Sequence, residues 1–77
     1  MTPVAPLIAG PSPARALREA RAWSGLTQAQ VAARAGIPLG TYVAWERGSR
    51  EVFVWRLAQL ADALGVSATD LILWSIR

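Results

Sequence analysis

The sequence contains no cysteine, no histidine and no lysine. Without cysteine, disulfide bonds and thiolate metal sites are excluded. Without histidine, the chain also lacks the commonest metal ligand and the commonest general base of enzymes. Its five carboxylates are scattered along the sequence, and no glycine-rich phosphate loop or nucleophile–base set accompanies them. We therefore expect no enzymatic activity, no metal, no cofactor and no small-molecule substrate.

Long hydrophobic runs are also missing, although 53% of the residues are hydrophobic. No run reaches the ~18 apolar residues that suggest a membrane span. The N-terminus lacks the basic region that begins a secretory signal. We therefore expect a soluble, cytoplasmic protein without membrane contact, associated with the nucleoid if it binds DNA.

The charge balance is modestly basic, with eight arginines against five acidic residues and a net charge of +3. This balance favours an anionic partner. The 77 residues are enough for one domain. A chain of this size buries only about 60% of its unfolded surface, so its stability is marginal and a partner could add to it.

The N-terminal segment differs in composition from the rest of the chain. Residues 1–13 hold four of the five prolines and no arginine before Arg15. Proline removes backbone donors and restricts helix formation, so we predict an extended arm over residues 1–12. An arm without basic residues is not expected to enter a DNA minor groove. Residues 13–77 form the predicted domain.

Helical periodicity and caps predict five helices and no strands. The expected ranges are 13–24, 28–35, 39–47, 53–64 and 68–74, with Ser12 as a candidate N-cap of the first. The first four ranges are each followed by a glycine, at Gly25, Gly36, Gly48 and Gly65. Glycine after a periodic segment is a helix stop signal. The sequence therefore predicts an all-α fold.

Residues 25–48 form the most informative stretch. Thr27 and Gln30 have the spacing of a capping box, and Ser67 with Asp70 has the same spacing later in the chain. Gly36 ends the first helix of this stretch, and a short turn leads into residues 39–47. Two short helices joined by a tight glycine-containing turn indicate a helix-turn-helix.

The core is predicted from apolar residues at helical spacing. The expected stripe of the fourth helix is Val54, Leu57, Ala58, Ala61 and Leu64.

Several spaced motifs then occur in a recognisable order, namely Leu26-Thr27-Gln28, Val31-Ala32, Gly36-Ile37, Tyr42, Trp45-Glu46-Arg47-Gly48 and the run from Leu60 to Ser67. This order resembles the Cro/phage-repressor (XRE-like) helix-turn-helix DNA-binding family, over about Leu17 to Leu71. The resemblance implies a five-helix, lambda-repressor-like domain whose recognition helix covers about residues 39–47. Tyr42 and Trp45 occupy the positions of this helix that usually face inward in the family, so they are expected to belong to the core.

The resemblance also implies a set of DNA contacts. Gln28 would touch a backbone phosphate, as its family counterpart does; the alternative is a solvated glutamine at a helix start. The full candidate set is Gln28, Leu39, Gly40, Thr41, Ala44, Arg47 and Arg50. Arg15, Arg18 and Arg34 are possible flanking contacts. Bidentate reading of guanine or adenine needs Arg, Lys, Asn or Gln, and the first half of this helix has none of them. Sequence discrimination is therefore expected to be weak unless Arg47 or Arg50 reaches a base.

A structural ion pair is implied as well. The family joins an arginine late in the first helix to the glutamate that ends the recognition helix. These positions are Arg21 and Glu46 in this chain. We therefore expect the pair to fix the recognition helix against the first helix.

The remaining aromatic and apolar residues suggest a protein interface. Phe53 and Trp55 do not both fit the apolar stripe of their helix, so at least one should be exposed. The tail from Leu71 to Ile76 is too apolar for a free C-terminus. The candidate interface residues are Phe53, Trp55, Trp74 and Ile76. Alternatively, the tail folds back to fill the core of the monomer.

Two functions follow from these observations. The first is a small DNA-binding transcriptional regulator that binds operator DNA as a homodimer and acts by occupancy, as a repressor or by recruiting a partner. The second is a protein-interaction module on the same helix-turn-helix fold, in which DNA binding is weak or lost.

Overall fold

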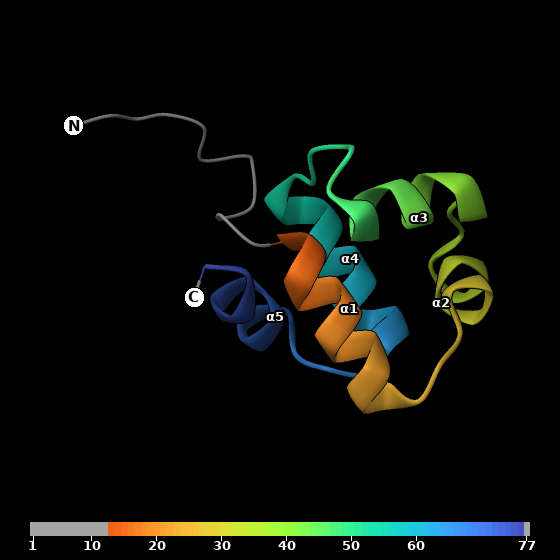
Figure 1. Cartoon of the computed structure of the whole chain (residues 1–77). Coiled ribbons are helices and arrows are strands. Elements are labelled where there is room, and N and C mark those ends of the chain that lie inside the picture. Colours follow the sequence, from red (N-terminus) through yellow and green to blue (C-terminus); the bar gives the residue numbers. More distant parts are fainter. Residues whose placement is uncertain (1–12, 77) are drawn as a thin grey trace.

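The computed structural model describes residues 13–76, which form five helices (Figure 1). They are α1 (Pro13–Ser24), α2 (Gln28–Ala35), α3 (Leu39–Arg47), α4 (Val54–Leu64) and α5 (Ala68–Ser75). The predicted all-α fold is confirmed, and the helix boundaries agree with the sequence to within one residue. The predicted arm and the Ser12 cap lie outside the described residues. Within residues 13–76, no helix has the length and apolar character needed to cross a bilayer.

The predicted helix caps are formed where they matter most for the helix-turn-helix. The Thr27 hydroxyl accepts the backbone N–H of Gln30 at 3.0 Å, and the Gln30 side chain accepts the backbone N–H of Thr27 at 2.9 Å. Both halves of the capping box are therefore present. In the second predicted box only one half is seen, in which Ser67 accepts the N–H of Asp70.

Gly36 shows why glycine is needed in the turn between α2 and α3. Its φ of +69° lies in the left-handed region, a backbone conformation that residues with a Cβ rarely adopt. In this conformation its N–H returns to the carbonyls of Ala32 and Ala33 and closes the end of α2. The chain can then turn at Ile37 and begin α3 directly. The other three predicted helix stops also have positive φ.

One apolar core joins the helices. In Figure 1, α1 runs beside α3 and α5, and α4 lies behind it; α4 also packs on α2 and α5. Tyr42 and Trp45 are buried, as predicted. The fully buried side chains include Leu17, Val31, Tyr42, Val52, Leu57, Leu60, Leu64 and Leu71.

The predicted stripe of α4 was partly wrong. Ala58 is exposed, and Val54 is only half-buried. The buried residues of α4 are Leu57, Leu60, Ala61, Ala63 and Leu64. This stripe is rotated relative to the prediction because α4 has neighbours on two sides, α2 and α5. A helix held between two others buries a wider face, and the rotation turns Ala58 toward solvent.

The apolar tail is divided between core and surface. Leu71 and Ser75 are completely buried, and Trp74 packs against the core while its indole N–H donates to Glu19 Oε1 at 2.7 Å. Leu73 and Ile76 are about half exposed, at 47% and 51%. Helix α5 therefore completes the monomer with one face and presents apolar side chains on the other.

Candidate nucleic-acid interface

Helix α3 is fixed to the domain through its inner face. Pro38 precedes the helix, and its carbonyl accepts the backbone N–H groups of Thr41 and Tyr42, each at 3.1 Å. Tyr42 and Trp45 then anchor α3 in the core. Because both large aromatic side chains point inward, the opposite side of α3 is held in a fixed orientation toward solvent.

The outer face of α3 contains the residues that the sequence singled out. Leu39, Gly40 and Arg47 are exposed, and Thr41 and Ala44 are half-buried. The structure therefore brings five of the seven candidate DNA contacts onto one helix face. Before Arg47 this face offers only the Thr41 hydroxyl as a polar side-chain group.

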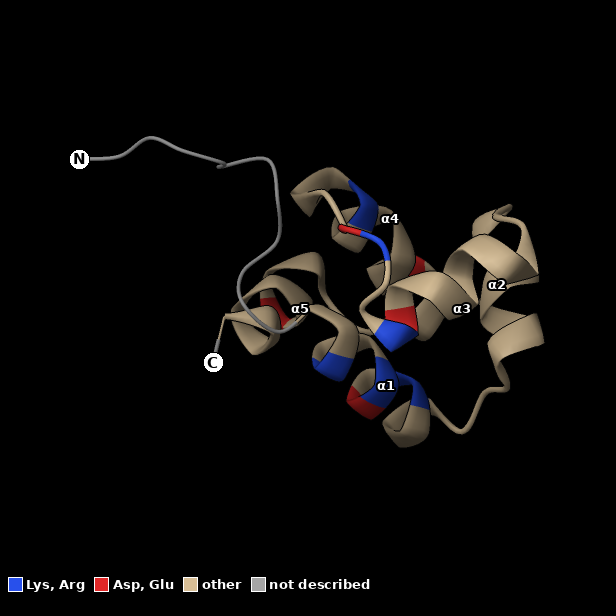
Figure 2. Cartoon of the chain, turned by 45° about the horizontal axis from the view of Figure 1, so that its top comes forward, with Lys and Arg blue, Asp and Glu red and all other residues tan. Residues whose placement is uncertain are grey.

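Two arginines extend this face at the end of α3. Arg47 and Arg50 are exposed, and neither forms an ion pair with a carboxylate within residues 13–76. The Arg50 guanidinium lies 3.5 Å from the Thr41 hydroxyl oxygen. Figure 2 shows basic residues along α1, at the end of α3 and in the loop after it. The positive charge available to an anionic ligand is therefore displaced from the start of α3 toward its end.

The Arg21–Glu46 pair lies beneath this face. Arg21 Nε donates to Glu46 Oε2 at 2.7 Å, and Arg21 Nη2 donates to Glu46 Oε1 at 3.2 Å. The Glu46 side chain is only 3% exposed, and that of Arg21 is 26% exposed. Arg21 also donates to the carbonyl of Leu26. This two-pronged pair ties α1 to the end of α3.

Two further residues join the pair, and the sequence did not indicate their roles. Gln28 Nε2 donates to Glu46 Oε1 at 3.0 Å, so the first residue of α2 is tied to the end of α3. Arg18 donates to the backbone carbonyl of Glu46. A cation at the C-terminal end of a helix satisfies a free carbonyl and complements the helix dipole. Gln28 is thus half-buried and engaged inside the protein, rather than simply solvated.

These contacts determine the charge state of the buried groups. Desolvation acts to raise the pKa of Glu46, but the hydrogen bonds from Arg21 and Gln28 and the nearby Tyr42 hydroxyl outweigh it, so the pKa is lowered. Burial raises the pKa of the Tyr42 phenol, and the Glu46 carboxylate raises it further. Among the described residues, no acceptor meets hydrogen-bonding geometry for the Tyr42 hydroxyl. Tyr42 therefore remains protonated, and its nearby hydroxyl helps to lower the pKa of Glu46.

The lowered pKa of Glu46 predicts acid sensitivity. The pKa of Glu46 in the folded protein lies below the ordinary value of 4.5. The ionised carboxylate therefore stabilises the fold at pH values above 4.5, and this contribution is lost as the pH falls through the folded-state pKa. In urea unfolding, the stability advantage of the native chain over Glu46→Gln should therefore shrink between about pH 7 and about pH 3. A constant difference over this range would contradict the assignment.

The carboxylates of the described residues do not gather into a cluster beside the interface. Within the described part of the chain, no group of three or more Asp or Glu side chains could hold a metal ion. The carboxylates of Glu19 and Glu46 are engaged in the contacts described above.

Comparison with known proteins agrees with this geometry. Residues 17–71 match the family model described as helix-turn-helix. Among solved structures, the clp gene regulator ClgR from C. glutamicum is similar, with a TM-score of 0.75 and 33% sequence identity; the match covers 82% of this chain and 82% of that chain. A search of curated proteins finds no match. The match over most of the chain and the common fold show that the protein belongs to the XRE-type helix-turn-helix family of DNA-binding proteins.

Proposed function

We propose that this protein is a transcription regulator that inserts α3 into the major groove of operator DNA. The observation that carries the proposal is the outer face of α3, which is fixed by Tyr42 and Trp45 and continues into the unpaired Arg47 and Arg50. The likeness to a clp gene regulator supports the same role. In a helix-turn-helix, the second helix lies in the major groove.

The contacts divide into positioning and reading. Arg47 and Arg50 bind phosphates, and the N–H groups at the start of α2 face a further phosphate, as helix N-termini do. Gln28 keeps one amide hydrogen and its carbonyl oxygen beyond its bond to Glu46, so it joins that phosphate contact from a fixed position. Leu39, Gly40, Thr41 and Ala44 approach the base edges.

Base reading through this face is limited. Leu39 and Ala44 can contact only apolar groups such as the thymine methyl, and Thr41 alone offers a hydroxyl. DNA shape and phosphate contacts therefore provide most of the selectivity. A protein of this kind acts by occupying its site, as a repressor or by holding a partner there.

A homodimer would supply a second α3 helix, which could bind the second half-site of the operator. Leu73 of α5 and Ile76, the residue after this helix, expose apolar side chains. A two-fold contact through these side chains would present two α3 helices to successive major grooves, which lie about 34 Å apart.

Selection of bound duplexes from a random DNA pool by the full-length chain tests the regulator function. We expect an enriched motif with two half-sites, and sedimentation should give the mass of a dimer. Absence of duplex binding near 50 mM salt, where phosphate contacts are strongest, would exclude this function. Enrichment of a single half-site by a monomer would exclude the dimer but leave the regulator function standing.

Gly40 provides an independent prediction. It lies inside α3, its φ is not positive, and a Cβ added there meets no atom within 4 Å. The fold therefore gives no reason for glycine, which costs about 0.5–1 kcal/mol relative to alanine in a helix. We expect Gly40→Ala to stabilise the protein by about that amount and to weaken DNA binding, because the added methyl group obstructs close approach. Stabilisation with unchanged DNA affinity would show that Gly40 does not approach DNA.

A further inference from the structure

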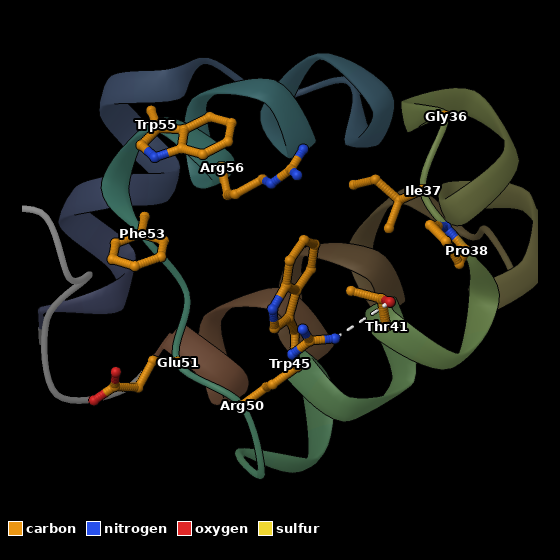
Figure 3. A pocket seen from close by; sticks show the side chains of 10 residues that line it. All are labelled: Gly36, Ile37, Pro38, Thr41, Trp45, Arg50, Glu51, Phe53, Trp55 and Arg56. Carbon is orange, nitrogen blue, oxygen red and sulfur yellow. Dashed lines mark hydrogen bonds between the residues drawn. The ribbon is translucent and has the colours of Figure 1, made fainter.

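A groove lies between α3 and the start of α4, beside the proposed DNA face. It has a volume of about 350 Å³, within the range of binding pockets. Thr41 and Trp45 of α3 line one side, where the Arg50 guanidinium also reaches to within 3.5 Å of the Thr41 hydroxyl (Figure 3). Phe53, Trp55 and Arg56 line the other side. Figure 3 shows the Trp45 ring between the side chains of α3 and those of α4. Neither the core nor the proposed DNA contacts account for the exposed rings of Phe53 and Trp55 in this groove.

Aromatic rings provide much of the apolar part of a mixed polar and apolar lining, and two of these rings are open to solvent. Trp55 is 55% exposed and Phe53 is 40% exposed, although both side chains are large enough to contribute strongly to a core. Trp45 is buried in the core and also borders the groove. Exposed aromatic side chains gathered around a hollow mark an interaction site.

Two guanidinium groups stand beside these rings. Arg56 lies over Trp55 at 4.4 Å and over Trp45 at 5.6 Å, and it donates to Gln59 at 2.7 Å. Within residues 13–76, neither Arg50 nor Arg56 forms an ion pair with a carboxylate. Glu51 also lines the groove, but in Figure 3 its carboxylate is turned away from Arg50 and Arg56. Arg56 is thus held in place by stacking but keeps its charge uncompensated.

From this arrangement, we propose that the groove binds an acidic peptide segment of a partner protein, with one large apolar side chain among the rings and carboxylates on Arg50 and Arg56. Aromatic residues and arginine are the residues that dominate protein-binding surfaces. Paired with carboxylates, the two guanidiniums would form the short, charge-assisted hydrogen bonds that orient such a peptide.

Other occupants fit less well. Duplex DNA presents phosphate and sugar along its backbone, and its exposed apolar group, the thymine methyl, is much smaller than a hollow of about 350 Å³. A second copy of the chain also lacks a suitable segment, because Glu46 is buried, Glu19 bonds Arg15 and Trp74, and the remaining described carboxylates are isolated in the sequence.

Peptide docking would also control DNA access. Thr41 and Arg50 line the groove and belong to the proposed DNA face. A peptide that takes Arg50 removes a phosphate contact, so DNA and peptide should compete. This consequence rests on the proposed function, whereas docking itself does not require it.

Selection of random linear peptides displayed on phage against the full-length chain, without DNA, tests docking. We expect enrichment of sequences in which acidic residues flank a large apolar residue. A fluorescein-labelled copy of the leading peptide should bind Arg56→Glu and Arg50→Glu about tenfold or more weakly than the native chain, as loss of a charge-assisted bond implies. Trp55→Ala should weaken binding through loss of the apolar contact, whereas Arg15→Ala, outside the groove, should have no effect.

Several outcomes would contradict peptide docking or its competition with DNA. Selection without an acidic–apolar pattern, or equal binding by native, Arg56→Glu and Trp55→Ala chains whose circular dichroism spectra are the same, would overturn docking. Weakened DNA binding by Trp55→Ala without any enriched peptide would assign the groove to DNA and overturn it as well. A peptide that binds but fails to displace the selected duplex would overturn only the competition.

Discussion

Replacing Glu46 with leucine should lower the free energy of unfolding by about 3 kcal/mol, near the lower end of the 3–5 kcal/mol that follows removal of one partner of a buried ion pair. The variant leaves Arg21 and Gln28 without their acceptor inside the protein. Arg21 keeps its bond to the Leu26 carbonyl and is partly exposed, which limits the loss. For a domain of this size, the melting temperature should fall by about 12–24 °C.

A double-mutant cycle separates the pair from the rest of the network. Urea unfolding of Arg21→Met, Glu46→Leu and the double variant should give a coupling energy well above zero, because the second substitution removes a charge that the first left unpaired. Glu46→Gln provides a milder replacement for the cycle where the leucine variant is unfolded. Zero coupling would contradict a structural role for the pair.

An exposed ion pair in the same chain can be compared with the buried Arg21–Glu46 pair. Arg15 and Glu19 form an ion pair at 3.0 Å on the exposed side of α1, with side chains 35% and 46% exposed. Exposed pairs four residues apart on a helix contribute about 0.3–0.5 kcal/mol. The coupling energy of this pair should therefore be several times smaller than that of Arg21 and Glu46. The contrast would show that burial, rather than the charge pairing itself, sets the cost.

The helices could be predicted because their signals are local. Thr27 and Gln30 satisfy each other's backbone N–H groups within one turn, and Gly36 adopts the left-handed conformation that its neighbours cannot. Such interactions depend on residues three or four positions apart, so spacing alone reveals them. The side of α3 that faces solvent followed instead from the family resemblance, which places Tyr42 and Trp45 inward.

The less predictable features depend on side chains that meet across the fold. Gln28 lies 18 positions from Glu46, and Arg18 lies 28 positions from it. The stacking of Arg56 over Trp45 likewise joins two helices. Ala58 was misplaced because the neighbours of α4 on two sides set its rotation. No local pattern encodes these contacts, since each requires the positions of two or more helices.

The network also connects the fold with the interface. Glu46 is buried beneath α3, while Arg47 is the next residue and is exposed on its surface. Arg18 and Arg21 of α1 and Gln28 of α2 all converge on Glu46. The end of α3 is therefore held from two helices at the position where the unpaired arginines begin. A rigid end of this kind would fix Arg47 relative to the DNA backbone.

Replacing both Arg47 and Arg50 with alanine should weaken binding to the selected duplex by about 100-fold or more, since each charge-assisted hydrogen bond is worth roughly 1.5–3 kcal/mol. The reduction should be similar for different DNA sequences, because phosphate contacts carry no base information. The slope of log K against log salt should also become shallower by about 1.8, which corresponds to two lost phosphate contacts at about 0.9 each. Fluorescence anisotropy titrations over a series of salt concentrations measure both quantities.

Arg15→Ala is the control for loss of positive charge at another site. It removes one charge, against two in the double variant. Although Arg15 was considered as a flanking contact, its side chain already binds Glu19, so affinity should change little and the salt slope should stay that of the native chain. A shallower slope in the double variant alone identifies Arg47 and Arg50 as phosphate contacts. An unchanged slope with lower affinity would instead indicate base contacts by one of them, and affinity would then fall unequally among DNA sequences. If neither affinity nor slope changes, other residues bind the DNA backbone, and the arginines at the end of α3 do not form the interface.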